Sequence, residues 1–168
     1  MHTDQSSYNE LIVSHDVLKK LQQLLQRHGV PFDVTRHEPV YTSEEAAAVR
    51  GTSLTSGAKA LICKADQSFV LIVIPANLRL ASKIIRKERS IRSFRFARRE
   101  EVQELTGLTP GAIPPFGSLF GLPTWCDQCL GDEQYINFNA GDHAVSISMT
   151  FDDYVAVEQP QIGHFTEI

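Results

Sequence analysis

Residues 58–75, AKALICKADQSFVLIVIP, hold two apolar runs on either side of a short polar turn. The first run is Ala58 to Lys64 and the second is Phe69 to Pro75. Val, Ile and Phe are typical of strands, and a polar turn between two such runs predicts a β-hairpin. Because hairpin strands are antiparallel, this stretch favours an antiparallel or mixed sheet over a doubly wound parallel one.

The chain before the hairpin predicts two helices and a strand. Leucines at helical spacing, with Ser14 as cap and Gly29 as stop, predict a first helix over residues 14–28. A short strand is expected over Phe32 to His37. The spacing of Thr42 and Glu45 fits a capping box, which opens a second helix that runs to Gly51.

The chain after the hairpin alternates between both element types. Four glycines and three prolines fall within residues 107–121, so no regular structure is expected there. Further helices are expected over Leu80 to Lys87, Arg99 to Thr106 and Thr150 to Val157, and further strands over Ile91 to Phe96, Leu122 to Cys126, Tyr135 to Asn139 and Val145 to Met149. About seven strands and five helices joined by short connections predict a single α+β domain.

Composition sets the broad class of the protein. A chain of 168 residues with 42% hydrophobic residues is long enough for one packed core and short for two. No apolar run approaches the roughly 20 residues that cross a bilayer, and Met1 to Asn9 lack a signal-peptide pattern. We therefore expect a cytoplasmic protein without membrane contact. With only three cysteines, reduced thiols are expected.

Basic residues are concentrated in one segment of a chain whose net charge is -4. Residues 83–99 hold 8 of the 16 Lys and Arg residues, whereas residues 100–168 hold none. Such a strip can bind a polyanion locally, or it can be a solvated helix face that keeps the protein soluble. The residues that we assign to it as candidate nucleic-acid contacts are Lys83, Arg86, Lys87, Arg89 and Arg92.

Cys126-Asp-Gln-Cys129 has the spacing of a redox pair or of half a zinc knuckle. The pair lies at the end of a predicted strand, not at the start of a helix, and no second Cys or His pair lies at zinc-finger distance. We therefore expect Cys126 to be a core residue and expect no metal site. A thiol oxidoreductase would require both sulfurs to be close and accessible. Nucleophile elbows, phosphate-binding loops and metalloprotease motifs are absent from the sequence.

Three features remain as candidates for chemistry. Lys59 lies in an apolar strand, so its amine either snorkels to solvent or faces a polar cleft. The loop Gly111-Ala-Ile-Pro-Pro-Phe-Gly117 is either a rigid connector or a stiff wall that a ligand can approach closely. His143 lies in a turn between two strands, where it is either exposed or near a strand end.

These features, in this order, resemble the YbaK / prolyl-tRNA-synthetase-associated domain family, the free-standing relatives of an editing domain in bacterial prolyl-tRNA synthetases. Each motif is weak alone, but their order and spacing are specific. The matching segments are His37 to Ala46, Gly57 to Lys64, Phe94 to Ala97, Leu105 to Gly107, Gly111 to Gly117 and Asn139 to Gly141.

The resemblance implies a strongly bent, barrel-like and mainly antiparallel mixed sheet surrounded by about five helices. Residues 14–168 would form this domain, and residues 1–13, which have no counterpart, are expected to be a flexible extension. The implied activity is hydrolysis of mischarged aminoacyl-tRNA in trans, with tRNA as partner, a synthetase as a further candidate partner and no cofactor. The alternative is a tRNA- or synthetase-binding module without turnover.

The resemblance also assigns roles to residues. Lys59, Gly111 and His143 are the candidate catalytic residues, with Lys59 near the aminoacyl ester and the terminal adenosine. An ester is already labile, so an enzyme need only position water and stabilise an oxyanion, for which we expect backbone groups of Gly111 and Gly117. Candidate substrate-binding residues are His37, Ile113, Pro114, Pro115, Phe116, Gly117, Asn139 and Ser146, the last at a position that is acidic in some branches. Alanine, cysteine, serine and proline are the expected amino acids.

Overall fold

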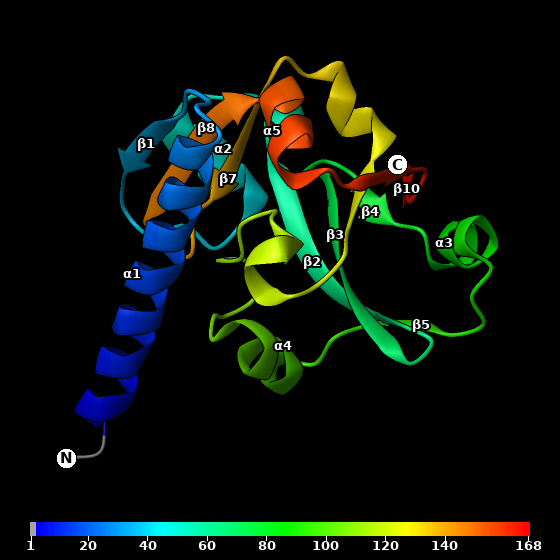
Figure 1. The fold of residues 1–168 in the computed structure, drawn as a ribbon, viewed down its shortest axis with the longest axis horizontal. Coiled ribbons are helices and arrows are strands. Elements are labelled where there is room, and N and C mark those ends of the chain that lie inside the picture. The colour runs from blue at the N-terminus through cyan, green and yellow to red at the C-terminus, as the bar shows by residue number, and fades with distance from the viewer. Residues whose placement is uncertain (1–2) are drawn as a thin grey trace.

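Two sheets and a long N-terminal helix organise residues 3–168, which the computed structural model describes (Figure 1). The α-helices are α1 (Thr3–Arg27), α2 (Ser43–Arg50), α3 (Ser82–Arg89), α4 (Arg99–Thr106) and α5 (Phe151–Glu158), with 3-10 helices η1 (Leu54–Ser56), η2 (Gly117–Phe120) and η3 (Gln128–Asp132). The strands are β1 (Asp33–Arg36), β2 (Ala58–Ala65), β3 (Ser68–Pro75), β4 (Arg79–Leu80), β5 (Phe94–Phe96), β6 (Thr124–Asp127), β7 (Tyr135–Asn139), β8 (Val145–Thr150), β9 (Gln161–Gly163) and β10 (Thr166–Glu167).

The larger sheet is built on the predicted hairpin. Its strand order is β5-β2-β3-β6-β9, and β2 pairs with β3 in register from Ala58 opposite Pro75 to Ala65 opposite Ser68. The β2–β5 pair is antiparallel, whereas β3–β6 and β6–β9 are parallel. The smaller sheet, β1-β8-β7, is antiparallel throughout, and β4 pairs with β10. The predicted α+β fold with a mainly antiparallel mixed sheet is confirmed, although the sheet is not closed into a barrel.

The two sheets meet at the start of β2. An isolated parallel bridge pairs Gly57, just before β2, with Asn137 in β7. Beside it the Asn137 side-chain amide donates to the Ser56 hydroxyl over 3.1 Å, and both side chains are buried. Residues at the start of β2 and at the end of β7 are therefore held next to each other at this junction.

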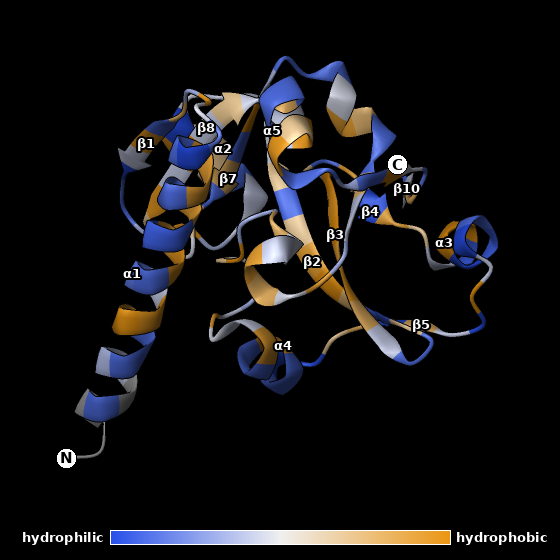
Figure 2. Cartoon of the chain, in the orientation of Figure 1, coloured by the Kyte–Doolittle hydropathy of each residue, from blue (hydrophilic) through white to orange (hydrophobic). Residues whose placement is uncertain are grey.

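Both faces of β3 are buried, which explains its unbroken apolar run. Leu71 and Val73 pack into the main core with α1 and β8, while Ile72 and Ile74 pack on the other face against α3 and the C-terminal segment. Figure 2 shows β3 as hydrophobic along its length. Successive strand residues point to opposite faces, so a strand with two covered faces needs apolar residues at every position.

Several helix ends have the capping residues that the sequence predicted. The Thr42 hydroxyl accepts from the Glu45 N–H over 3.1 Å, and Gly51 ends α2 with a φ of 69°. Gly107 ends α4 in the same left-handed conformation, at the residue where the sequence predicted the stop. The Thr150 hydroxyl accepts from the Asp153 N–H at the start of α5. These predictions are confirmed because each depends on a few neighbouring residues.

Some predicted boundaries are wrong. The first helix begins at Thr3, not at Ser14, so residues 3–13 continue α1 as a helix that extends past the body of the molecule (Figure 1). Its second half is anchored by the buried side chains of Leu18, Leu21 and Leu25. Residues 107–121 contain one short 3-10 helix, η2, and the edge strands β4, β9 and β10 were not predicted. No helix within residues 3–168 is long and apolar enough to cross a membrane.

Candidate active site

A pocket of about 120 Å³ opens at the junction of the two sheets. Its walls come from α2 and the segment before it, from the start of β2, from the loop after α4 and from the β7–β8 turn. Its lining includes Arg50, Lys59, Gly111, Ile113, Asn139 and His143. Five of these, all except Arg50, were predicted as site residues from separate parts of the sequence, and the fold brings them together.

Lys59 lies in β2 opposite Ile74, is half-buried and lines the pocket. The sequence left open whether its amine reaches solvent or faces a cleft, and the structure places the residue in a cleft that Gly111 also lines. The lining, as far as residues 3–168 show it, holds Arg50 as a second cation and no carboxylate. The pocket is therefore positively charged and suits a ligand that is anionic or becomes anionic.

The loop after α4 is held in place by hydrogen bonds to its carbonyl groups. The Gly111 carbonyl accepts from the Asn139 side-chain amide over 2.7 Å, and the Ala112 carbonyl accepts from the Gly141 N–H over 2.8 Å. The N–H groups of Gly111 and Ile113 make no hydrogen bond within the described residues. Gly111 has a φ of 91°, and a Cβ there would lie 3.2 Å from His143 Cε1. Glycine is required at this position for both reasons.

His143 also holds the loop after α4, through hydrogen bonds of both its ring nitrogens. Its Nδ1 donates to the Val40 carbonyl over 3.0 Å, because a carbonyl oxygen can only accept. In the neutral ring Nε2 then accepts from the Thr109 hydroxyl over 3.1 Å, and the ring lies 4.8 Å from that of Tyr41. Both ring nitrogens are engaged within the protein, so His143 connects the segment before α2 to the loop after α4.

Arg50 is a charged residue of the pocket lining that the sequence did not predict. It lies in the last turn of α2 and lines the pocket beside Lys59. Its Nε donates to the Ser146 hydroxyl over 2.8 Å, and its Nη2 donates to the Asn139 side-chain oxygen over 2.9 Å. Burial lowers the pKa of its guanidinium to about 10. A basic residue in the last turn of a helix is so common that no sequence signal distinguished this one.

His37 and Ser146 lie behind Arg50 and not in the pocket lining. The buried Ser146 hydroxyl is 2.8 Å from His37 Nε2, and His37 Nδ1 is 2.8 Å from the Glu38 carbonyl oxygen. Both residues were predicted to bind substrate directly. The structure instead connects them to the pocket through the Arg50 guanidinium.

Four predicted loop residues lie away from the pocket. Phe116 is fully buried and packs edge-on against Phe138 and Tyr154, with ring centroids 5.7 and 5.2 Å apart. The Gly117 N–H, which we expected to face the substrate carbonyl, donates to the Thr124 hydroxyl over 2.9 Å in the interior. Pro114 and Pro115 are also buried outside the pocket lining. The expectation for Gly117 is therefore wrong, because core packing uses this end of the loop.

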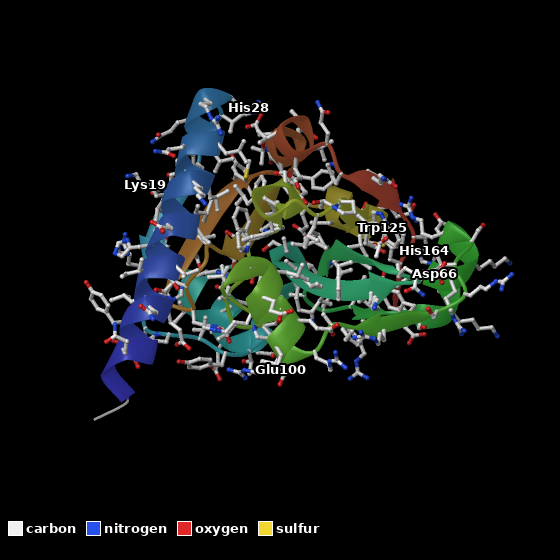
Figure 3. All side chains as sticks on the ribbon, turned by 60° about the horizontal axis from the view of Figure 1, so that its bottom comes forward. Lys19, His28, Asp66, Glu100, Trp125 and His164 are labelled. Atoms are coloured by element: carbon white, nitrogen blue, oxygen red, sulfur yellow. The ribbon has the colours of Figure 1, made fainter. Side chains whose placement is uncertain are left out.

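The basic strip lies far from the pocket. Lys83, Arg86 and Lys87 on α3, followed by Arg92, are exposed, and Figure 1 places α3 at the opposite end of the molecule from α2. Trp125 and His164 lie at the α3 end in Figure 3, away from Lys19 and His28 on α1.

Arg89 differs from the other residues of the strip. Its guanidinium lies 4.6 Å from the ring centroid of Trp125 and 5.0 Å from that of Phe165, and it donates to Gln161 over 2.7 Å. Desolvation by these neighbours lowers its pKa. The side chain stacks against Trp125 and the C-terminal segment, unlike the exposed residues of the strip, and its predicted contact with nucleic acid stays a prediction.

The cysteine pair does not meet the requirements of a redox centre. Cys126 is fully buried in the main core, and burial raises the pKa of its thiol to about 12. The thiol of Cys129 is half-buried, and its pKa is also raised. A redox cysteine needs an accessible thiol of low pKa. Within residues 3–168, no cluster of three or more His, Cys, Asp or Glu residues could hold a metal ion.

Comparison with known proteins identifies the family of this chain. The chain is an α+β domain with a pocket lined by Lys59 and Arg50, and its residues 37–157 match the family described as the aminoacyl-tRNA editing domain. The chain belongs to this family. These matches, with the relatives below, confirm the predicted family, the α+β fold and the prediction of an aminoacyl-tRNA deacylase.

Two curated proteins and one solved structure illustrate the relationship. The "Multifunctional Ser/Thr-tRNA deacylase ProXp-y" of Escherichia coli (strain K12) is 36% identical over 157 residues, covering 88% of this chain and 91% of that protein. The proline–tRNA ligase of Bacillus licheniformis is 31% identical over an alignment of 127 residues that covers 69% of this chain and 20% of the ligase. A crystal structure of a candidate trans-editing enzyme for prolyl tRNA synthetase has a TM-score of 0.80 at 23% identity, covering 90% of this chain and 98% of that one.

Proposed function

We propose that this deacylase releases serine or threonine from mischarged tRNA. The relative that carries a Ser/Thr-tRNA deacylase name matches 88% of this chain. Thr42, Ser43 and Asn139, whose side chains carry hydroxyl and amide groups, line the pocket. A pocket with polar side chains suits a hydroxylated amino acid.

The observation that carries this proposal is that Lys59 and the Gly111 loop line one pocket. The Gly111 and Ile113 N–H groups are among the backbone donors of that lining that make no hydrogen bond within residues 3–168, so they are free to donate to an ester carbonyl. As water attacks, the carbonyl oxygen becomes negative, and both the donors and the Lys59 ammonium stabilise that charge. Ile113 takes the place that we expected for Gly117.

Activation of the water is assigned to the substrate and not to His143. The two ring nitrogens of His143 are held by Val40 and Thr109. The pocket lining within residues 3–168 has no carboxylate that could act as a base. The ribose hydroxyl next to the ester is close to the reacting carbonyl by covalent connection, so it can orient the attacking water. His143 then shapes the site by holding the loop on which Gly111 lies.

For the tRNA body we propose contacts with Lys83, Arg86, Lys87 and Arg92. These residues are exposed, and they carry positive charge at the opposite end of the molecule from the pocket. Phosphate contacts of this kind make affinity fall with salt. Delivery of the substrate by a synthetase, and a cytoplasmic location, stay predictions.

The test is release of amino acid from a panel of tRNAs mischarged with serine, threonine, alanine, cysteine or proline. We expect the wild type to act fastest on serine or threonine. Lys59→Ala should lower the rate by about a hundredfold, and Lys59→Arg should restore part of it. Lys64→Ala is the matched control, because Lys64 lies in the same strand but packs over the Phe69 ring 5.6 Å away. Binding of tRNA without release by the wild type would instead show a non-catalytic module.

A further inference from the structure

A chain of hydrogen bonds runs from His37 to the loop that lines the pocket. It passes from His37 to the Ser146 hydroxyl, then through the Arg50 guanidinium to the Asn139 amide, and ends at the Gly111 carbonyl. The four links measure 2.8, 2.8, 2.9 and 2.7 Å. The residues belong to the segment after β1, to β8, to α2, to β7 and to the loop after α4. Arg50 is the central member, because its guanidinium donates to both Ser146 and Asn139.

The direction of each link in this chain is determined by chemistry. His37 Nδ1 must donate to the Glu38 carbonyl, so in the neutral ring Nε2 accepts from the Ser146 hydroxyl. Arginine can only donate, so its Nη2 selects the oxygen end of the Asn139 amide. The NH₂ end of that amide is thereby turned toward the Gly111 carbonyl. Arg50 thus determines which way Asn139 points.

Arg50 is half-buried, and no ion pair compensates for the loss of water around its charge. Within residues 3–168 the ion pairs join Glu101 to Arg95 and Arg98, and no carboxylate lies at salt-bridge distance from Arg50. Burial of a guanidinium without an acid costs free energy. A pKa of about 10 still leaves the group charged at neutral pH. A half-buried cation at a pocket wall that contacts only neutral acceptors marks a position where function accounts for the cost.

The geometry points to Arg50 as a positioning residue of the editing reaction, an inference that rests on the proposed function. Arg50 orients the Asn139 amide, the amide holds the Gly111 carbonyl, and the Gly111 and Ile113 N–H groups of the same loop then face the ester carbonyl. Arg50 itself need not touch the reacting atoms. Its contribution is to the rate of the chemical step and not to affinity for tRNA.

Two substitutions separate this role from simple stabilisation of the fold. Arg50→Lys keeps the positive charge but cannot span Ser146 and Asn139 together. Asn139→Asp keeps an acceptor for Arg50 and turns that contact into an ion pair, but it places a carboxylate oxygen against the Gly111 carbonyl in place of the donor. Asn139→Asp should therefore leave the melting temperature unchanged or raised while the loop loses its anchor.

The experiment measures kcat, KM and melting temperature on the mischarged tRNA that the wild type hydrolyses fastest. Both variants should lower kcat by about a hundredfold and leave KM within about twofold, because a displaced loop misaligns the donors. The double variant should be no slower than the slower single variant, since both act through one contact. Arg27→Lys, an exposed arginine at the end of α1, is the control for a general effect of Arg replacement.

Each other result overturns the inference. A fall in kcat of less than about tenfold in Arg50→Lys would show that the loop does not need Arg50, and the same result in Asn139→Asp would show that it does not need the amide. A raised KM at constant kcat in Arg50→Lys would show that Arg50 binds substrate. If Asn139→Asp lowers the melting temperature as well as kcat, the contact between Arg50 and Asn139 serves only to stabilise the fold. If the wild type itself releases no amino acid, the proposed function fails and the inference fails with it.

Discussion

Replacement of Gly111 by alanine tests the loop most directly. Gly111 has a φ of 91°, and the added methyl group would lie 3.2 Å from His143 Cε1. The backbone strain alone should lower the free energy of unfolding by about 2 kcal/mol. In a domain of this size, that corresponds to a fall in melting temperature of about 4–8 °C. The loop can relieve the strain only by moving, so kcat for deacylation should fall by about a hundredfold.

Gly29→Ala provides the matched control for Gly111→Ala. Gly29 also has a positive φ, of 64°, but an added Cβ there has no neighbour within 4 Å, and the residue lies outside the pocket. We expect this variant to lose about 1 kcal/mol of stability and to keep its kcat. The assay is single-turnover release of amino acid at a temperature well below both melting points. Equal kcat values for the two variants would refute the argument that the loop geometry sets the rate.

Three further results are expected. In the native protein, alkylation at pH 8 should label Cys129 faster than Cys126, whose thiol has a pKa raised to about 12 by burial; equal labelling by mass spectrometry would contradict the packing. Hydrogen bonds from Arg95 lower the pKa of Glu101 from 4.5 to about 2, so the stability it contributes is present above pH 4.5 and is lost as pH falls toward 2. Denaturant titrations should show a weaker pH dependence in that window for Glu101→Gln, and an unchanged profile would remove this contact from acid unfolding. Arg89→Lys should lower stability by about 1 kcal/mol without changing the salt dependence of tRNA affinity, whereas Arg86→Ala should reduce that dependence; the reverse pattern would return Arg89 to the tRNA surface.

Much of the fold could be predicted because its signals are local. The hairpin, the start of α2 at Thr42 and the end of α4 at Gly107 each depend on residues that are close in the sequence. The start of α1 could not be predicted in this way, because residues 3–13 lack the apolar stripe by which the helix was recognised and their helix projects past the core. The short edge strands β9 and β10 depend on distant partners for their existence.

The site was predicted where a residue type is unusual for its position or where the family resemblance assigned a role, as for Ile113, Asn139 and His143. Lys59 in an apolar strand and Gly111 in a proline-rich loop are residues of the first kind, and both line the pocket. Arg50 contacts residues that are 89 and 96 positions away, so nothing near it in the sequence indicates its role. The stacking of Arg89 could not be predicted for the same reason, since the rings that cover it come from Trp125 and Phe165.

The junction of the two sheets also determines how activity is lost on heating. Because the walls of the pocket come from α2, β2, the loop after α4 and the β7–β8 turn, no fragment that lacks one sheet contains a complete site. Hydrolytic activity therefore requires that nearly the whole chain is folded. Thermal inactivation that runs ahead of global melting would show that the walls separate before the rest of the chain unfolds, and the bridge between Gly57 and Asn137 is one backbone link that such a separation of the sheets would break.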